Sequence, residues 1–297
     1  MPSVSSLREA ASFLAAADGD GRRVRIGDDL TLDGMDRVLE HEAGDLTCTV
    51  EAGIRLSTLQ AVLGAAGQRL ALDPPGNPTI GACIAANLSG PLRHRFGAPR
   101  DLVLGVTLVL ADGTIANAGG KVVKNVAGYD LGKLVCGSRG TLALIARVSL
   151  RLHPIPVASG TVVAETDDPA SVVDALMRSP LQPSAVDVLH PGRVAVLFEG
   201  GQAGVDDQLR RALDLVGGVA AGDDVWAESR ARQATARGRV RFTPGSLRET
   251  LADLDEAVVR ASAGVAYVAH ETAPDHTAAA LEERIRAEFD PSGTLAA

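Results

Sequence analysis

The sequence predicts an α+β protein with two lobes, for three reasons. The chain has 297 residues, which is enough for two lobes that each bury a core. From residue 22 to about residue 156, short β-like runs alternate with Gly, Pro and Asp. After the HPIP stretch at 153–156 the rhythm changes to helical and strand-like patterns in alternation. For this second half we expect antiparallel strands with helices packed on one face.

The first half contains recognisable elements in order. Residues 1–21 predict a short amphipathic helix. We do not expect a signal peptide there, because these residues lack a long apolar core behind a positively charged start. Residues 55–68 predict a helix, since apolar side chains recur there at helical spacing. The ADGTI sequence at 111–115 predicts a turn between two strands. No run in the chain approaches the roughly 20 apolar residues of a membrane-spanning helix, so we expect no integral membrane segment.

The second half predicts a strand at 159–166, a helix at 168–179 and two strands within 184–200 around a turn at His190. Helices follow at 205–218 and 223–233, and a strand at 239–243 leads into a helix at 247–262. A strand at 264–270 and a helix at 275–289 complete the pattern.

Composition excludes several function classes. The formal net charge of −8 argues against nucleic acid as a partner, because neutralising phosphates needs a basic excess. Cys48, Cys83 and Cys136 are far apart, and no CxxC or Cys/His cluster predicts a zinc site or an iron–sulfur cluster in this chain. An odd number of cysteines fits a reducing cytoplasm. The absence of GxSxG, Walker A and strand–GxGxxG–helix patterns removes serine hydrolase, nucleotidase and Rossmann interpretations.

One segment is unusually bare. TIGACIAANLSGP, at 79–91, follows the proline-rich LDPPGNP loop and consists mostly of small residues. Gly81 and Gly90 argue against a regular helix there. Such a segment indicates either a close approach of backbone to a ligand or a tight Gly/Ala packing turn.

The run KVVKNVAGYDLGKLVCGSRGTLALIARVSLRLHPIP, at 121–156, resembles the FAD-binding subunit of bacterial glycolate oxidase. That subunit belongs to the flavoproteins of the vanillyl-alcohol oxidase/p-cresol methylhydroxylase (PCMH) type. The resemblance extends upstream through residues 49–113 and includes the closing FDPSGTL at 289–295. It implies a PCMH-type FAD-binding domain over 1–156, a cap domain over 157–284 that bears on the substrate, and a return to the first domain over 285–297.

The resemblance also implies which residues meet the cofactor. The segment matching TIGACIAANLSG would wrap the flavin, with backbone N–H groups directed at phosphate oxygens. GSRGTLALI, at 137–145, would lie beside the flavin. Asp101 would either cap or orient the flavin loop or serve as a surface turn carboxylate. The expected cofactor-binding residues are Pro75, Gly76, Asn77, Thr79, Ile80, Gly81, Ala82, Asn87, Gly90, Asp101, Gly140 and Ile145. We expect the FAD to be held non-covalently, since Cys83 is the nearest thiol and no His or Cys occupies a recognised linkage position.

A basic cluster and a short polar run follow. Arg93, Arg95 and Arg100 are candidates for holding a substrate carboxylate or a cofactor phosphate, because guanidinium groups match both, and a solvated charged face is the alternative. In KNVAGYD, Tyr129 is either a flavin neighbour or a core tyrosine, and Lys124 and Asn125 precede it.

Two features depart from the family pattern. The first is an HxHxGDGN-type metal motif, which is missing: His190, His270 and His276 are isolated, so we expect no metal and name no catalytic base. The second is the Gly/Ser-rich loop after the first strand, where Asp28 and Asp29 stand beside Gly27 and would repel a phosphate that they faced. Ala82 and Ala143 also stand where glycine is usual.

Two functions therefore stay open. In the first, the chain is the FAD-binding subunit of a glycolate or other 2-hydroxy-acid oxidase, which passes electrons to an iron–sulfur subunit beside a homologous flavoprotein subunit. In the second, it is a flavin-poor structural subunit of such a complex. The resemblance implies a cytoplasmic chain that reaches the inner membrane only through its partners. We expect the isolated chain not to oxidise glycolate or lactate at a useful rate.

Overall fold

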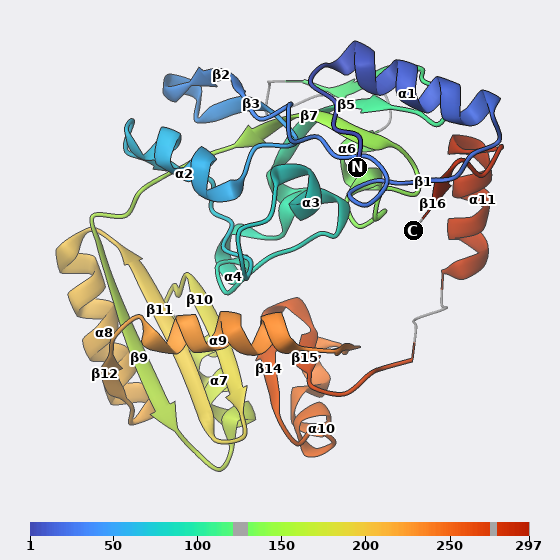
Figure 1. Cartoon of the computed structure of the whole chain (residues 1–297). Helices are drawn as coiled ribbons and strands as arrows, with labels where there is room; N and C mark the ends of the chain where they lie inside the picture. Colours follow the sequence, from blue (N-terminus) through green and yellow to red (C-terminus); the bar gives the residue numbers. More distant parts are fainter. Residues whose placement is uncertain (121–129, 274–277, 297) are drawn as a thin grey trace.

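A five-stranded antiparallel sheet forms the centre of the first lobe (Figure 1). The computed structural model describes residues 1–120, 130–273 and 278–296. The strands run in the order β2-β3-β7-β5-β6. Their bounds are β2 Val38–Glu42, β3 Thr47–Glu51, β5 Val103–Val109, β6 Ile115–Gly119 and β7 Leu144–Arg151. β7 holds the centre because its LIARVSLR sequence is buried along most of its length.

Short helices surround this sheet. They are α1 Leu7–Gly19, α2 Leu56–Gly64, α3 Ile80–Ala85, α4 Arg93–Phe96, α5 Pro99–Leu102 and α6 Leu131–Val135. The predicted helix at 55–68 ends at Gly64, because Gly67 takes a positive φ of 68° and β4 (Gln68–Arg69) then pairs with β8 (His153–Pro154). The bare segment contains a helix, contrary to expectation: Thr79 caps α3 by accepting from the Ala82 N–H.

The second lobe is a seven-stranded sheet in which every described pairing is antiparallel. The order is β12-β9-β11-β10-β14-β15-β13. The strands are β9 Ala158–Glu165, β10 Ala185–His190, β11 Arg193–Gly200, β12 Val219–Ala221, β13 Gly238–Arg241, β14 Ala257–Arg260 and β15 Val265–Val268. The α+β class with an antiparallel cap sheet is therefore confirmed.

The helices of this lobe divide between the two faces of the sheet. α7 (Pro169–Arg178), α8 (Gln202–Val216) and α10 (Leu247–Ala252) pack against one face, as expected. α9 (Asp224–Thr235) lies on the other face, where Trp226 packs against Ala185 and Leu189. Strand alternation explains this, because successive residues of β10 point to opposite faces and both faces are apolar.

The helix predicted at 247–262 is wrong in its second half. α10 ends at Ala252, and Ala257–Arg260 forms strand β14 in the middle of the sheet. The run AVVR is buried at all four positions, and its β-branched valines favour a strand. A short, fully buried apolar run does not distinguish helix from strand by periodicity, so the sequence pattern misled the prediction.

The C-terminal segment lies against the first lobe (Figure 1). α11 (Ala279–Phe289) precedes β16 (Leu295–Ala296), which pairs in parallel with β1 (Val24–Arg25). The Thr294 hydroxyl donates to Asp18 at 2.7 Å, and Arg286 donates to the Leu295 carbonyl. α11 begins at residue 279, six positions before residue 285, where we expected the chain to return to the first domain.

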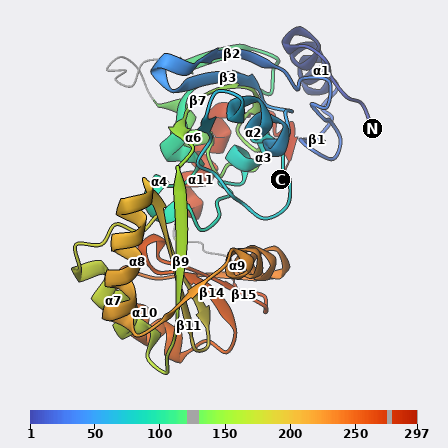
Figure 2. The same ribbon diagram turned by 90° about the vertical axis from the view of Figure 1, so that its left-hand side faces the viewer.

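Buried polar contacts join the two lobes, which are stacked in Figure 2. Arg69 and Glu199 form an ion pair with 2.7 Å between Nη1 and Oε1. The Gln233 side chain of α9 donates to the Ser89 carbonyl at 2.9 Å. Next to Ser89, Gly90 packs on Asp73: a Cβ at Gly90 would lie 1.8 Å from the Asp73 carbonyl oxygen. Among the described residues, no helix is long and apolar enough to cross a membrane.

Gly90 should be intolerant of any side chain. We expect Gly90→Ala to lower the free energy of unfolding by at least roughly 2 kcal/mol, because the new methyl group meets backbone. Gly64→Ala is the matched control, since a Cβ there meets nothing within 4 Å, and it should change stability by less than about 1 kcal/mol. Urea unfolding of both variants checks this. Equal stability of the two variants would contradict the packing role.

Asp73 should make stability depend on pH. Burial raises the pKa of its carboxyl from 3.8 to about 7, although Arg260, the Leu92 N–H and Arg230 oppose the shift. Between these two values the folded chain retains a proton that the unfolded chain releases. The free energy of unfolding should therefore fall as pH rises toward 7, by at most about 1.4 kcal/mol per unit from this group.

Asp73→Asn keeps an acceptor for the Leu92 N–H, which donates to Asp73 Oδ1 at 3.1 Å, but does not titrate. Its stability relative to the parent chain should rise between pH 5 and pH 7. Urea titrations at both pH values give the comparison, and parallel pH profiles would show that Asp73 does not titrate in this range.

Candidate functional site

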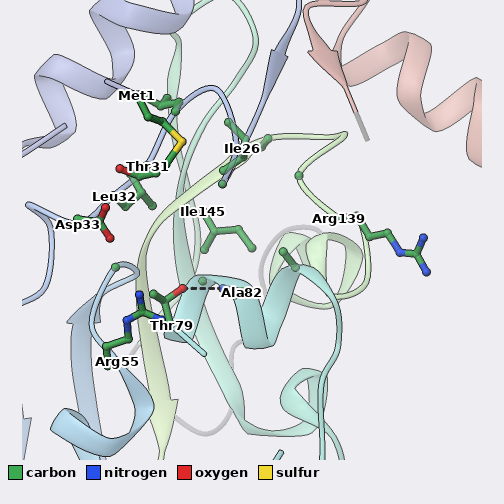
Figure 3. A pocket seen from close by; sticks show the side chains of 17 residues that line it. Met1, Ile26, Thr31, Leu32, Asp33, Arg55, Thr79, Ala82, Arg139 and Ile145 are labelled. Carbon is green, nitrogen blue, oxygen red and sulfur yellow. Dashed lines mark hydrogen bonds between the residues drawn. The ribbon is translucent and has the colours of Figure 1, made fainter. Parts of the chain in front are cut away.

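A cavity of about 320 Å³ lies between the loop after β1 and the start of α3 (Figure 3). Three segments far apart in the sequence form its walls: residues 26–33, the 79–85 stretch and the 139–145 stretch. Its lining residues are Met1, Ile26, Gly27, Leu30, Thr31, Leu32, Asp33, Gly53, Arg55, Thr79, Gly81, Ala82, Ala85, Arg139, Gly140, Ala143 and Ile145.

Small residues line much of this cavity. Gly81 approaches Ala52 so closely that a Cβ would lie 3.1 Å from the Ala52 side chain and carbonyl. Gly140 has a φ of +81°, and a Cβ on it would lie 3.2 Å from Ile26. Ala82 and Ala143 present only methyl groups. The bareness of the sequence therefore serves both tight packing and an open space beside the backbone.

The first turn of α3 does not present free amides to the cavity. The Ile80 N–H donates to the Ile54 carbonyl at 2.9 Å, and the Gly81 N–H donates to Ala52 at 2.7 Å. The Ala82 N–H is held by the Thr79 hydroxyl at 3.1 Å, as Figure 3 shows. The expected array of N–H groups directed at phosphate is consequently engaged by protein acceptors in this structure.

The loop after the first strand does line the cavity, despite its unusual sequence. Ile26, Gly27 and residues 30–33 form the wall opposite α3 (Figure 3). Arg25 forms ion pairs with both Asp28 and Asp29, at 3.6 Å and 3.2 Å, and the Asp29 carboxylate also accepts the Arg25 N–H. These bonds hold the pKa of Asp29 below its usual value. Neither Asp28 nor Asp29 lines the cavity, so the expectation that they would repel a phosphate is not supported.

Charged groups are sparse along the walls. Arg55 donates to the Asn77 carbonyl at 3.1 Å, and Asp33 lines the opposite side. Arg139 lines the end away from Arg55, as Figure 3 shows. Its backbone is left-handed, with a φ of 54°, and its N–H donates to the Ala85 carbonyl at 2.7 Å. Non-glycine residues are uncommon in the left-handed region of backbone conformation, and those that occur there cluster at functional sites.

A second cavity, of about 870 Å³, lies between the lobes and shares Arg139 with the first. Its first-lobe lining comes from Pro75, Leu88 and Arg139, and the cap supplies the rest. The cap residues are Gln233, Ala234, Ala236, Arg237, Gly238, Arg239, Arg241, Tyr267, Thr272 and Ala273. Among the described residues, Arg139 is the one lining residue that the two cavities share.

The structure brings some of the predicted cofactor residues together and leaves others apart. Thr79, Gly81, Ala82, Gly140 and Ile145 line the first cavity. Pro75 lines the second. The remainder serve other contacts or lie outside both: Gly76, Asn77, Ile80, Asn87, Gly90 and Asp101.

Several of these outlying residues have clear packing roles. Asn77 Oδ1 accepts the Ser57 N–H at the start of α2, and Asp101 accepts the Ala98 N–H at the start of α5. Ile80 belongs to the first-lobe core. Asn87 is the exception: its φ is +48°, and its buried Oδ1 has no hydrogen-bond partner in the part of the chain that the structure describes.

The three predicted arginines line neither cavity. Arg93 is half-buried and approaches the Ser89 hydroxyl at 3.4 Å, and burial lowers its pKa. Arg95 stacks on the Phe96 ring at 5.9 Å and points to the Gln182 carbonyl. Arg100 is exposed. Arg95 lines a third cavity, of about 290 Å³, whose other lining residues are His94, Leu176, Met177, Leu181, Gln182 and Pro183. The carboxylate-binding role of the three arginines stays a prediction.

The remaining candidates give no metal or reactive thiol. Over residues 1–120, 130–273 and 278–296, no group of three His, Cys, Asp or Glu side chains could hold a metal ion. His190 bonds to the Leu254 carbonyl, and His270 is exposed. Burial raises the pKa of Cys48, Cys83 and Cys136 to about 12. Lys124, Asn125, Tyr129 and His276 lie outside the described residues.

Sequence reasoning missed Arg139 and the whole cap side of the second cavity. Arg139 stood inside the quoted GSRG motif, but only its glycine neighbour was assigned. The cap residues come from the end of α9 and from the segments after it, and their nearness to the first lobe depends on α9 lying on the inner face of the sheet. No local pattern signals that placement.

Comparison with known proteins agrees with this architecture. Residues 19–119 match the family model described as an FAD binding domain. Glycolate oxidase subunit GlcE of Escherichia coli (strain K12) is 32% identical over 201 residues, covering 66% of this chain and 56% of the relative. Glycolate oxidase subunit GlcD of Bacillus subtilis (strain 168) is 30% identical, covering 60% and 39%. The mitochondrial D-lactate dehydrogenase [cytochrome] of Arabidopsis thaliana is 37% identical, covering 55% and 29%.

Solved structures show the same fold. An alkyldihydroxyacetonephosphate synthase superposes with a TM-score of 0.72 at 16% identity, covering 98% of this chain and 74% of the other. At that identity the likeness concerns the fold alone. The chain spans about half the length, or less, of the curated relatives it matches. The resemblance to glycolate oxidase subunits is confirmed, and residues 19–119 of the first lobe match an FAD binding domain, which supports FAD as the cofactor.

Proposed function

We propose that this chain is the FAD-binding subunit of a glycolate or related 2-hydroxy-acid oxidoreductase complex. In this proposal it passes electrons from the acid, through the flavin, to an iron–sulfur subunit, beside a homologous flavoprotein subunit. The relatives named as glycolate oxidase subunits support a multi-subunit assembly. The D-lactate dehydrogenases support a small 2-hydroxy acid as the substrate class.

One observation supports the proposal more than any other: Arg139 lines both cavities. A cofactor in the first cavity would reach toward the space between the lobes, where a small acid has room to lie. Interfaces between domains are common places for small-molecule sites.

The residues present fit the cofactor. Ala82 and Ala143 present only methyl groups to the cavity, and Arg55 and Arg139 also line it. FAD, when bound, supplies the acceptor for two electrons from the acid. Non-covalent attachment belongs to the proposal, because Cys83 is buried and burial raises the pKa of its thiol to about 12, which keeps it protonated.

The catalytic base stays unassigned, and for this reason a second function remains. In the alternative, the chain is a flavin-poor structural subunit and a partner carries out catalysis. The engaged amides of Ile80, Gly81 and Ala82 favour this reading, because they leave few backbone donors for a phosphate.

Domain limits and location belong to the same proposal. We place the FAD domain at 1–156, the cap at 157–284 and the returning segment at 285–297, which the pairing of β16 with β1 supports. A cytoplasmic location, with membrane contact only through partner subunits, accords with the kind of complex proposed.

A charge placed in the first cavity should prevent FAD binding. Gly81→Asp adds bulk and negative charge there, but its new side chain also meets Ala52. Ala82→Asp is the sharper variant, because Ala82 is exposed and lines the cavity. We expect both variants to lose FAD, and Ala82→Asp to keep its stability, since a carboxylate suits the first turn of a helix.

The matched control is Ala61→Asp, which adds the same charge on an exposed position of α2 outside the cavity. FAD binding is followed by fluorescence quenching, and folding by urea unfolding. Retention of FAD by Ala82→Asp would place the cofactor elsewhere and leave the 79–91 segment as a packing turn.

The isolated chain should bind FAD weakly and reversibly. Each missing hydrogen bond to a charged phosphate costs on the order of 1–3 kcal/mol, so two would weaken binding roughly a hundredfold or more. We expect substoichiometric FAD after purification and tighter binding when partner subunits are added. Absorbance of the purified chain gives the occupancy, and acid precipitation should leave the yellow colour in the supernatant. Full occupancy of the chain alone, or a yellow pellet, would contradict this.

A further inference from the structure

The rim of the cavity between the lobes carries arginines on a single strand. β13 (Gly238–Arg241) is an edge strand of the cap sheet, and Arg239 and Arg241 both line the cavity. Val240, between them, packs against the cap core. Since residues i and i+2 share a face of a strand, the two guanidinium groups leave the backbone on the same side, roughly 7 Å apart.

The position of Arg239 is well defined by its neighbours. It pairs with Tyr267 of β15, and its guanidinium carbon lies 5.4 Å from the centre of the Tyr267 ring. The Thr272 hydroxyl bonds to both the N–H and the carbonyl of residue 239, at 3.1 Å and 3.2 Å. The strand that carries both arginines is therefore anchored, while their charged ends face the cavity.

These arginines lack the partners that other arginines of the chain have. Arg237, just before the strand, is paired with Glu271 at 2.7 Å. Within the described part of the chain, no carboxylate lies within ion-pair distance of Arg139, Arg239 or Arg241. The whole chain is acidic, with 37 Asp and Glu against 29 Lys and Arg. The amino-acid composition therefore does not explain why three arginines without a described ion-pair partner line the same cavity.

Like charges close together repel, and an anion between them removes that cost. Arg139 also lines the first cavity, so it is available to the cofactor there. Arg239 and Arg241 are therefore the two arginines that could hold an anion in the second cavity. The half-buried Arg93 adds positive potential near Tyr267. A monocarboxylate would neutralise only one of the two strand arginines, because one carboxylate satisfies one guanidinium fork.

We propose that Arg239 and Arg241 form an anion site for a small acid with two anionic groups, and that the site prefers it over the corresponding monocarboxylate. The identification of that acid as a 2-hydroxy acid rests on the proposed function; the preference for two anionic groups rests on the cavity alone. The assignment also moves acid recognition from Arg93, Arg95 and Arg100 of the first lobe to the cap.

The test uses two probes that differ by one carboxylate, glycolate and tartronate (hydroxymalonate). Each is titrated into the full chain as purified, at pH 8 and low salt, and heat of binding is recorded. We expect tartronate to bind at least about tenfold more tightly than glycolate. Arg239→Gln and Arg241→Gln should each remove this preference, and both variants should fold, since the two side chains are exposed on an edge strand.

Arg237→Gln is the matched control, because it removes one positive charge from the same rim but from a group already neutralised by Glu271. It should keep the preference for tartronate. Equal affinities in the parent chain, persistence of the preference in both strand variants, or an equal loss in Arg237→Gln would overturn the proposal.

The outcome is separable from the fate of the proposed function. Heat of binding needs neither bound FAD nor turnover. A chain that binds no FAD but prefers tartronate would remove the flavoprotein proposal and keep the anion site. A chain that binds FAD, and that binds glycolate and tartronate with equal affinity, would keep the flavoprotein proposal and remove the anion site.

Discussion

The most deeply buried contact between the two lobes is made by one cation, which acts beside the Arg69–Glu199 ion pair and the Gln233–Ser89 hydrogen bond. Arg260 of β14 is 2% exposed, and three first- and second-lobe groups surround it. Its Nη1 donates to the Ser89 carbonyl at 3.3 Å and its Nη2 to Gln233 at 2.8 Å, while its Nε lies 3.4 Å from Asp187. A buried charge is tolerated only when it is paired and hydrogen-bonded. Separating Arg260 from these partners would therefore leave an unpaired buried charge, at a large cost in free energy.

This cluster determines the shape of the space between the lobes. The Ser89 carbonyl, near the end of the bare segment, accepts from both Arg260 and Gln233 of the cap. The other end of the same segment caps α3 beside the first cavity. Arg260 also lies 5.0 Å from the Tyr267 ring, which lines the second cavity. One network of contacts therefore connects the 79–91 segment, the cap sheet and the wall of the second cavity.

The sequence predicts the architecture well where patterns are local. The strands around the HPIP change, the hairpin after Val109 and most cap helices follow from periodicity and turn residues. It fails where tertiary context decides, as in the AVVR run that becomes β14 and in α9, which covers the inner face. A buried strand and a buried helix present the same apolar run, so only the sheet into which it fits resolves the choice.

The candidate site divides in a similar way. Thr79, Gly81, Ala82, Gly140 and Ile145 were found because small residues and a family motif mark a close backbone approach. Gly90 was assigned on the same signal, but it is small because Asp73 packs on it. The cap arginines carry no motif, and they share a cavity with Arg139 only through the relative placement of the two lobes. Long-range burial of a charged group leaves no pattern in a single sequence.

We propose that the two cavities that share Arg139 act as one site, with the flavin in the first and an acid in the second. The most direct measurement is the absorption spectrum of the FAD-loaded chain during titration with tartronate, which cannot report binding unless the acid lies near the flavin ring. The account predicts a saturable change in the flavin band that Arg239→Gln abolishes. Binding detected by heat, with a flavin spectrum that does not change, would show that the two cavities are separate sites.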